Sequence, residues 1–175
     1  MLPAVVFPVR QDGHVVYTVS RHLRPVASRW WNTAERLAPN PRLAFYQPPG
    51  HAVGGVVVTE GPLDALSALA SGYQAAAILG AATVTPTIAN QLAATGQRLL
   101  LALDNDPQGR RAQDRLVALI TQRGAPWSAL PIPDHHGDLN AWHTASRHRW
   151  RQVVHTCDRL AGCIGAEPVP PPSVA

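Results

Sequence analysis

Three acidic residues follow two short apolar segments, and they are the residues whose types and spacing best fit a chemical site. One segment covers residues 56–59 and is followed by Glu60; the other covers residues 98–103 and is followed by Asp104 and Asp106. Short apolar runs bounded by turn residues are typical of buried strands, and α/β folds place functional residues at the carboxyl ends of strands. Three carboxylates converging there would bind a hard divalent cation such as Mg²⁺ and would suit phosphate chemistry.

The strands that carry these acids decide whether they can converge. Alternate residues of an extended segment share a face, so we expect Asp104 and Asp106 to point toward one spot and Asn105 to point away. Glu60 reaches that spot only if its strand is the neighbour of the strand that ends at Leu103. Right-handed crossovers then predict the strand order 2-1-3-4, with the site between strands 1 and 3.

An alternation of strand-like and helix-like segments supports this arrangement. It predicts a four-stranded parallel sheet with helices on both faces. The predicted strands are 56–59, 75–79, 98–103 and 127–132, and the predicted helices are 62–70, 85–95, 109–122 and 139–145. A last helix is expected over 147–160, before a Pro-rich tail over 167–172 that is either disordered or extended.

The segment ahead of the alternation has a different pattern. Residues 4–10 and 14–21 are strand-like, and the Asp12-Gly13 pair between them predicts a β-hairpin. Residues 24–50 contain five prolines and are expected to be irregular. We therefore divide the chain into an N-terminal hairpin and basic subdomain (1–52), an α/β domain (53–146), and a C-terminal helix with a Pro-rich tail (147–175).

Two further acids and three histidines leave alternatives open. Asp64, in the first turn of the helix after Glu60, and Asp138, after the fourth strand, are either helix caps or additional metal ligands. His135 and His136 beside Asp138 suggest a transition-metal site, but we favour a polar loop in which histidines occur by chance, and the same holds for His143.

Composition restricts the class of protein without identifying it. The chain has 175 residues, 46% of them hydrophobic, which suits one main domain with a small appendage. Its net charge of +4 and pI of about 9.8 suit a polyanionic partner without requiring one. We expect Cys157 and Cys163 to be reduced thiols on a C-terminal helix. The sequence has no long apolar run and no signal-peptide pattern, so we expect a cytoplasmic protein with no membrane partner.

The acidic motifs together resemble the signature of the Toprim domain, which bacterial primases, topoisomerases and some nucleases share. The matching residues are Glu60-Gly61-x-x-Asp64, Leu79-Gly80 and Asp104-x-Asp106-x-x-Gly109. From about Val5 to Leu116 the chain is more specifically similar to the catalytic core of the bacterial replicative primases of DnaG type. The residues that carry this second resemblance are Phe7-Pro8-Val9-Arg10-x-x-Gly13, Arg21 and Arg29-Trp30-x-Asn32-Thr33.

The resemblance implies a Rossmann-like Toprim fold and a set of site residues. Glu60, Asp104 and Asp106 would bind Mg²⁺ or Mn²⁺ and act in catalysis, with Glu60 as the acid or base. Asp64 and Asp138 would be further acids near the metals. The cations would bind the triphosphate of an incoming nucleotide and activate the 3′-hydroxyl of the primer.

The resemblance also implies a nucleic-acid-binding region ahead of the acids. Arg21, Arg29 and Asn32 match positions that line a basic template groove, and we add Arg24 and Trp30 to this predicted set. Arginine binds phosphate as a bidentate fork. The Trp30-Trp31 pair either stacks on the bases of a single strand or packs the N-terminal layer onto the sheet.

The chain departs from the primase pattern in several places. Within this sequence we expect no zinc-binding domain and no helicase-binding domain. Ala81-Ala82 follow Leu79-Gly80 where the family usually has a threonine, and Asn105 replaces a usual glycine. Three functions stay open: primer synthesis from NTPs on single-stranded DNA, hydrolysis of phosphodiesters by the same centre, and a non-catalytic module that binds nucleic acid or a replication partner such as a helicase or another primase subunit.

Overall fold

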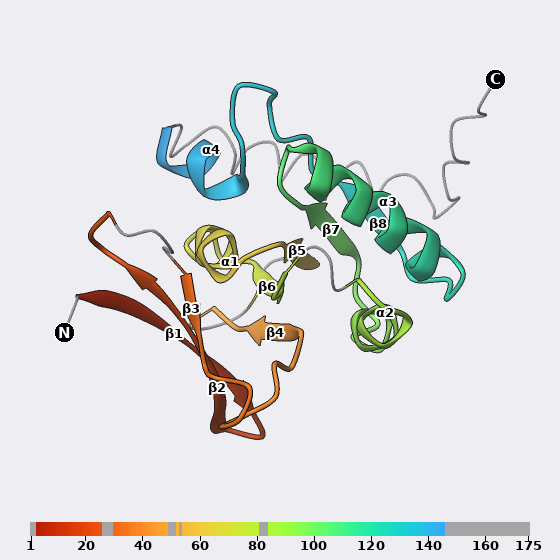
Figure 1. The fold of residues 1–175 in the computed structure, drawn as a ribbon. Coiled ribbons are helices and arrows are strands. Elements are labelled where there is room, and N and C mark those ends of the chain that lie inside the picture. Colours follow the sequence, from red (N-terminus) through yellow and green to blue (C-terminus); the bar gives the residue numbers. More distant parts are fainter. Residues whose placement is uncertain (1–2, 26–29, 49–51, 53, 81–83, 146–175) are drawn as a thin grey trace.

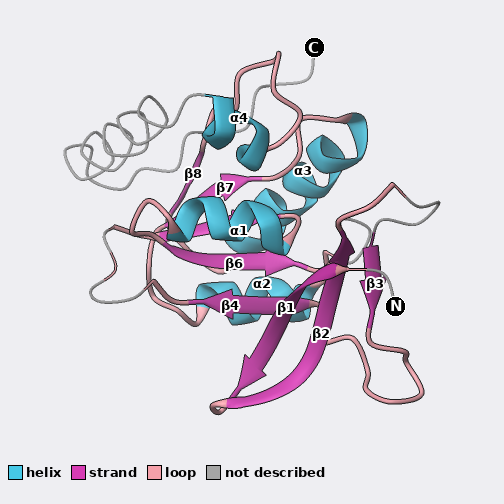
Figure 2. Ribbon diagram, turned by 90° about the vertical axis from the view of Figure 1, so that its left-hand side faces the viewer, coloured by secondary structure: helices cyan, strands magenta, loops and turns pink. Residues whose placement is uncertain are grey.

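A computed structural model describes residues 3–25, 30–48, 52, 54–80 and 84–145. It contains a three-stranded antiparallel sheet near the N-terminus and a five-stranded mixed sheet with helices on both faces (Figure 1). The two sheets lie side by side, and the smaller one crosses the edge of the larger (Figure 2). The α/β fold class predicted from the sequence is therefore confirmed.

The smaller sheet begins with the predicted hairpin. Strands β1 (Ala4–Gln11) and β2 (His14–His22) pair antiparallel through a turn at Asp12 and Gly13, whose φ angles are 49° and 80°. Positive φ at both turn residues matches the right-handed twist of the flanking strands, which is why Asp-Gly suits this position. Strand β3 (Trp30–Asn32) then pairs with β2. The expectation that residues 24–50 are irregular is thus wrong at β3.

The larger sheet has the strand order β4-β6-β5-β7-β8. Its last four strands in that order run parallel and follow the order predicted from the crossovers. The fifth strand, β4, pairs antiparallel with β6 at the edge of the sheet. The expectation that residues 24–50 are irregular is therefore wrong at β4 too. The strand bounds are β4 Leu43–Tyr46, β5 Val56–Thr59, β6 Gln74–Ile78, β7 Leu99–Ala102 and β8 Trp127–Ala129.

In the described part of the chain, four helices cover the two faces of this sheet (Figure 1). They are α1 (Pro62–Leu69), α2 (Pro86–Ala93), α3 (Pro107–Thr121) and α4 (Leu139–Ala145). Alternate residues of β5 point to opposite faces: Val57 joins the core under α1 and α4, whereas Val56 and Val58 join the core under α2 and α3. Because β5 is covered on both sides, all four of its residues are buried.

The smaller sheet attaches to the larger one through its inner face. Phe7, Val9, Tyr17 and Val19 are buried there and belong to the same core as Val57. The outer face of the smaller sheet is open, because Val6 is 55% exposed and lies on the opposite side of β1 from Phe7. Hydrophobic burial along one face therefore holds the N-terminal sheet against the α/β unit.

The C-terminal predictions lie outside the described residues. These are the helix over 147–160 with Cys157 and Cys163, and the Pro-rich tail. No helix in the described ranges combines the length and apolar character needed to cross a membrane.

Candidate metal centre

The register of the central strands brings Glu60 and Asp104 to one edge of the sheet. β5 and β7 are parallel neighbours with Thr59 opposite Ala102. Glu60 follows directly on β5, and Asp104 lies two residues beyond the end of β7. The prediction that these two strands are neighbours is confirmed, so both acids lie at the carboxyl edge where an α/β sheet supports a site.

Asp104 is strongly perturbed by its surroundings at this edge. Burial, followed by the negative charges of Glu60, Asp64, Asp138 and Asp106, raises its pKa from 3.8 to about 8. Its Oδ1 atom is buried and accepts no hydrogen bond from any described residue. A buried acceptor without a partner is costly, and a cation would satisfy the oxygen and offset the repulsion between the carboxylates.

Asp106 lies at the start of α3 and has a different role from Asp104. It is the N-cap of the helix, and its Oδ1 accepts hydrogen bonds from the backbone N–H groups of Gln108 (2.8 Å) and Gly109 (2.7 Å). The side chain is exposed, whereas Asp104 is half-buried. Asp104 and Asp106, which were both predicted as metal ligands, therefore differ, because one oxygen of Asp106 is engaged in capping.

Gly109 explains the spacing of the second acidic motif. A Cβ atom at this position would lie 2.1 Å from the backbone oxygen of Asp104 and 2.8 Å from its carbonyl carbon. Only glycine lets the first turn of α3 pack this closely on the strand end. In the Asp104-x-Asp106-x-x-Gly109 motif, Asp106 therefore caps α3, and Gly109 lets the start of α3 pack against the backbone of Asp104.

Asp64 and Asp138 converge on the N-terminus of α4. Asp64 Oδ1 accepts a hydrogen bond from the Asn140 N–H at 2.9 Å, and Asp138 Oδ1 accepts one from the Ala141 N–H at 2.6 Å. The capping alternative is therefore observed for Asp138. For Asp64 it takes an unexpected form, because α1 has Gly61 as its N-cap and the carboxylate bonds to a different helix.

The environment of Asp64 joins it electrostatically to the same cluster. Burial is the largest effect and raises its pKa to about 6; the Asn140 N–H lowers it, and the charges of Asp138 and Glu60 raise it further. Asn140 is a residue that sequence reasoning missed. Its side-chain oxygen also accepts a hydrogen bond from Ser67 Oγ at 3.3 Å, which ties α4 to α1.

The donor chemistry fits a hard cation better than a transition metal. The five acids offer only carboxylate oxygens, which Mg²⁺ prefers. Within the described ranges, no three His, Cys, Asp or Glu side chains stand close enough together to enclose a metal ion as they are placed. This holds for His135 and His136 too, although their rings lie 4.1 Å apart. The fit to a divalent cation therefore rests on the unpartnered Oδ1 of Asp104 and on the mutual repulsion of the acids.

The predicted nucleic-acid-binding residues lie mainly on the inner face of the smaller sheet. Arg21 is opposite Trp30 and Asn32 is opposite Val19. The Arg21 guanidinium lies 5.2 Å from the centre of the Trp30 ring, and that ring lies 5.9 Å from Phe7. Trp30 remains 39% exposed, so the inner face presents a cation and an aromatic ring beyond the buried core.

The remaining two members of this predicted set, and Trp31 of the tryptophan pair, lie elsewhere. Trp31 points to the outer face, is 61% exposed and packs edge-on against His22 with ring centres 4.8 Å apart. Arg24 is exposed beyond the end of β2, and Arg29 lies outside the described residues. The two tryptophans therefore serve different faces, although they are adjacent in the chain.

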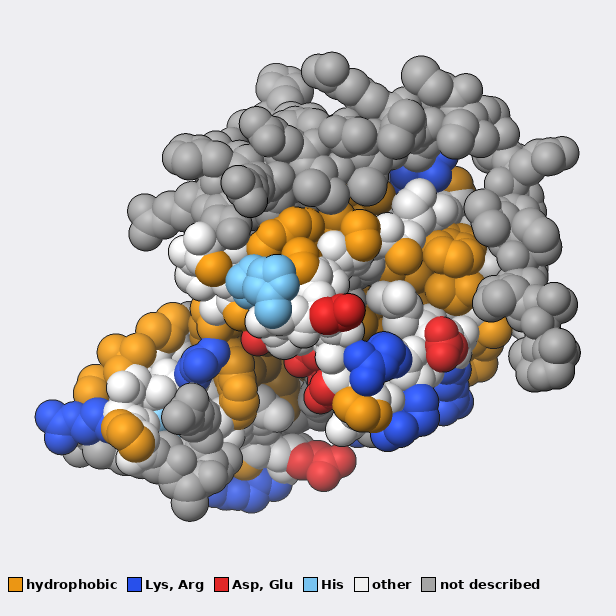
Figure 3. Space-filling model, turned by 90° about the horizontal axis from the view of Figure 1, so that it is seen from above, with side chains coloured by type: hydrophobic (Ala, Val, Ile, Leu, Met, Phe, Trp, Pro, Cys, Tyr) orange, Lys and Arg blue, Asp and Glu red, His pale blue; other side chains and the backbone are white. Residues whose placement is uncertain are grey.

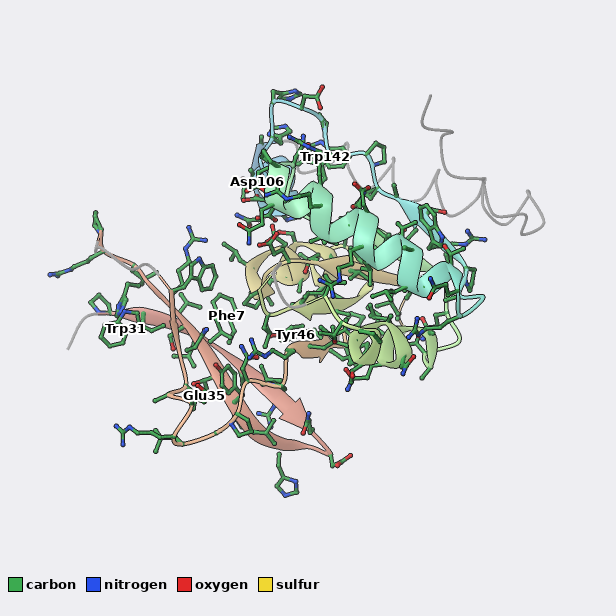
Figure 4. All side chains as sticks on the ribbon, turned by 45° about the vertical axis from the view of Figure 1, so that its right-hand side comes forward. Phe7, Trp31, Glu35, Tyr46, Asp106 and Trp142 are labelled. Carbon is green, nitrogen blue, oxygen red and sulfur yellow. The ribbon has the colours of Figure 1, made fainter. Side chains whose placement is uncertain are left out.

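The acids and the inner face of the smaller sheet border the same hollow. Seen from above, acidic side chains gather between the two lobes of the molecule, with basic side chains near them (Figure 3). Figure 4 places Asp106 at the start of α3 above this gap, Phe7 between the lobes and Trp31 on the far side of the smaller sheet. The arrangement would suit a polyanion that lies across the N-terminal sheet and reaches the acids once a bound cation compensates their charge.

Comparison with known proteins gives a family match and a fold. Residues 57–143 match the family described as Toprim-like. No curated protein matches the sequence significantly.

Several solved structures share the fold. The zinc-binding and RNA polymerase domains of Aquifex aeolicus primase match with a TM-score of 0.68 and 19% identity, over 93% of this chain and 40% of that one. The primase fragment of the bacteriophage T7 primase-helicase matches with a TM-score of 0.65 and 20% identity, over 86% of this chain and 62% of that one. A DnaG primase catalytic domain bound to ssDNA matches with a TM-score of 0.63 and 20% identity, over 85% of this chain and 52% of that one. The chain thus spans between 40% and 62% of these three structures.

Proposed function

We propose that this chain, whose residues 57–143 match the Toprim-like family, is a Mg²⁺-dependent nucleotidyltransferase of primase type. It would make RNA primers from NTPs on single-stranded DNA, in the cytoplasm, during DNA replication. The observation that carries the proposal is the buried, unpartnered Oδ1 of Asp104 among four other carboxylates. Its position at the strand ends of a fold shared with primase cores supports the same reaction.

The acids would have different roles in the proposed site. Glu60 and Asp104 would hold the cation, with the remaining oxygen of Asp106 beside them. A divalent cation bound there supplies Lewis-acid activation for phosphoryl transfer. Glu60, half-buried at the end of β5, is the proposed acid or base for the primer hydroxyl.

Asp64 and Asp138 would complete the acidic edge from a second loop. Each already accepts a hydrogen bond from the N-terminus of α4. These bonds keep one oxygen of each acid toward the helix, so the other oxygen is the proposed contribution to the cation site. The bond to Asp64 also ties the start of α4 to α1.

The inner face of the smaller sheet is the proposed template surface. Trp30 would stack on a base, and Arg21, which lies over the Trp30 ring, would neutralise a phosphate. Asn32 and Arg24 extend the surface along β3 and beyond β2. A helicase or another primase subunit is the proposed protein partner, because one similar structure comes from a primase-helicase protein.

The first experiment is a primer-synthesis assay. The protein is incubated with single-stranded DNA, labelled NTPs and Mg²⁺, beside the double variant Asp104→Ala/Asp106→Ala. Short labelled RNA from the parent alone supports the proposal. Shortening of the DNA without NTPs would point instead to the nuclease reaction, and DNA binding that is equal in both proteins without turnover would point to a binding module.

A second experiment tests the cation alone. Calorimetry measures Mn²⁺ binding to the parent and to the same double variant. We expect binding to the parent and its loss in the variant. Equal binding by both proteins would refute the assignment of the acids, whatever reaction the protein performs.

A further inference from the structure

We infer that Arg110 binds a phosphate group of the substrate at the rim of the acidic edge, and that Asn105 holds Arg110 in place for this. The inference deepens the proposed function and rests on it. The phosphate belongs either to a nucleoside triphosphate or to a nucleic-acid strand, and these two sources share the same chemistry. Neither residue belongs to the site predicted from the sequence.

Asn105 fixes the position of the Arg110 side chain. Arg110 lies in the first turn of α3, and its NH1 group donates hydrogen bonds to the backbone oxygen of Asn105 (3.0 Å) and to Asn105 Oδ1 (2.9 Å). Asn105 lies between Asp104 and Asp106 in the chain, and its own N–H donates to the Gly137 oxygen at 2.7 Å. The guanidinium is thus anchored to a loop that is itself anchored, beside two of the acids.

The anchoring leaves the phosphate-binding edge of the guanidinium available. The NH1 group makes both bonds to Asn105, whereas the Nε and NH2 groups make no hydrogen bond to any described residue. The Nε–NH2 edge carries two parallel N–H groups, which match two oxygens of a phosphate. Arg110 also forms no ion pair within the described ranges, although Asp104 and Asp106 flank the residue that holds it.

Arg123 at the other end of α3 shows what a purely structural arginine does here. Its Nε bonds to Asn90 Oδ1, its NH1 donates to the Leu119 oxygen at 2.6 Å, and its NH2 donates to the Pro86 oxygen at 3.3 Å. All three nitrogens are engaged, and they tie α3 to α2. Arg110 uses one nitrogen only, and its partner is the loop that carries the acids.

Electrostatics favours an anion at this position. Five carboxylates at one edge repel a substrate phosphate until positive charge compensates them. A cation held by Glu60 and Asp104 provides part of that charge, and Arg110 adds a fixed positive charge at the exposed rim of the same site. The fork would orient the phosphate, while the cation neutralises it.

The test measures binding, so it does not depend on turnover. Dissociation constants are measured by calorimetry with Mn²⁺ present, for GTP and separately for a short single-stranded oligodeoxynucleotide. Arg110→Ala should weaken at least one of these ligands by about tenfold, as expected for a charge-assisted hydrogen bond to phosphate. The ligand that is weakened identifies the source of the phosphate. Arg110→Lys should restore only part of the affinity, because a lysine keeps the charge but lacks the fork.

Matched variants separate a specific role from loss of charge. Arg111→Ala removes the same charge from the next residue of α3, and Arg10→Ala removes an arginine that is anchored through NH1 to Gly13 at a distant turn. Both should leave the two affinities within about twofold, which lies within the range for exposed charges. Asn105→Ala should act in the same direction as Arg110→Ala, and the double variant should be no weaker than Arg110→Ala alone.

The outcomes distinguish this inference from the proposed function. Equal effects of Arg110→Ala and Arg111→Ala, or no effect of either, would overturn the role of Arg110. Mn²⁺ binding without ligand should be unchanged in Arg110→Ala. If Mn²⁺ binding instead survives in Asp104→Ala/Asp106→Ala, the proposed cation site fails independently of Arg110. Circular dichroism melting curves would verify that each variant is folded.

Discussion

The carboxyl edge of the large sheet and the inner face of the N-terminal sheet border the same hollow but are built in opposite ways. At the edge, acids crowd together, the pKa of Asp104 is raised to about 8 and one of its oxygens has no described partner. On the inner face, Arg21 and Trp30 stabilise each other across two strands. The first arrangement is costly to the fold in the absence of a ligand, and the second is not. The contrast is the one expected if the edge is the proposed catalytic site and the inner face is the proposed template surface.

Replacing Asp104 should give the largest effect and tests the first half of this contrast. We expect Asp104→Asn to reduce primer synthesis at least about a hundredfold, which corresponds to ~2.7 kcal/mol in the activation barrier. The reason is that the variant keeps the shape of the side chain but loses the charge of a cation ligand. Initial rates of RNA synthesis measure the effect, and Asp114→Asn on the exposed face of α3 is the control. A rate close to that of the parent would show that the acidic edge is not the catalytic site.

Enlarging Gly109 should disturb the edge through its backbone. In Gly109→Ala the added Cβ would overlap the Asp104 backbone oxygen, so the start of α3 must move. We expect a cost of about 1–3 kcal/mol and a melting temperature lower by about 3–10 °C, together with weaker Mn²⁺ binding. Gly137→Ala is the matched control at the same edge, because its Cβ would meet nothing within 4 Å. Similar melting temperatures for the two variants would show that the close approach of α3 is not required.

Truncating the two adjacent tryptophans separately should sharpen the contrast within the small sheet. Trp30→Ala removes an inner-face ring and should weaken binding of single-stranded DNA by about fivefold to tenfold, since stacking on one base contributes roughly 1–3 kcal/mol. Trp31→Ala removes an outer-face ring and should change the affinity less than twofold. Fluorescence anisotropy of a labelled oligonucleotide measures both. The reverse order of effects would move the template to the outer face.

The pH dependence of the melting temperature should give the smallest effect. It tests how much the crowded acids destabilise the fold when no cation is bound. The folded-state pKa of Asp104, about 8, is above its ordinary value of 3.8, so the folded protein retains a proton that the unfolded chain releases. This group therefore contributes stability that is full below about pH 4 and is lost as the pH rises to about 8. At pH 8 without divalent cations we expect Asp104→Asn to melt about 2–4 °C above the parent, the shift that about 1 kcal/mol produces in a protein of this size. At pH 5 the difference should shrink, and Mg²⁺ at pH 8 should stabilise the parent only.

The local patterns of the sequence predicted the parts that depend on neighbouring residues. Apolar runs followed by acids located β5 and β7, and Asp-Gly located the turn of the hairpin. The crossover rule then gave the order of the four parallel strands. These features follow from strand alternation, turn geometry and chain handedness, which operate over short distances or apply to every such fold.

The errors occurred where a segment takes its structure from a distant partner. β3 and β4 are short, and neither has an alternating pattern long enough to indicate a strand by itself. β4 is a strand because β6, about thirty residues later, offers a hydrogen-bonding edge. Local propensity does not predict pairing with a distant strand, so the segment between the hairpin and the first parallel strand was expected to be irregular.

By itself, the sequence determined which acids lie at the strand ends, and the requirement that they share one site predicted that the strands bearing Glu60 and Asp104 are neighbours. Only the tertiary structure decided what each acid does there. Asp106 and Asp138 cap the helices that follow them, Asp64 reaches across to α4, and Asp104 keeps an oxygen without a described partner. Residue type and spacing give every carboxylate the same capacity to bind a cation. Which of them has its oxygens already occupied by backbone N–H groups depends on how the helices pack around the sheet.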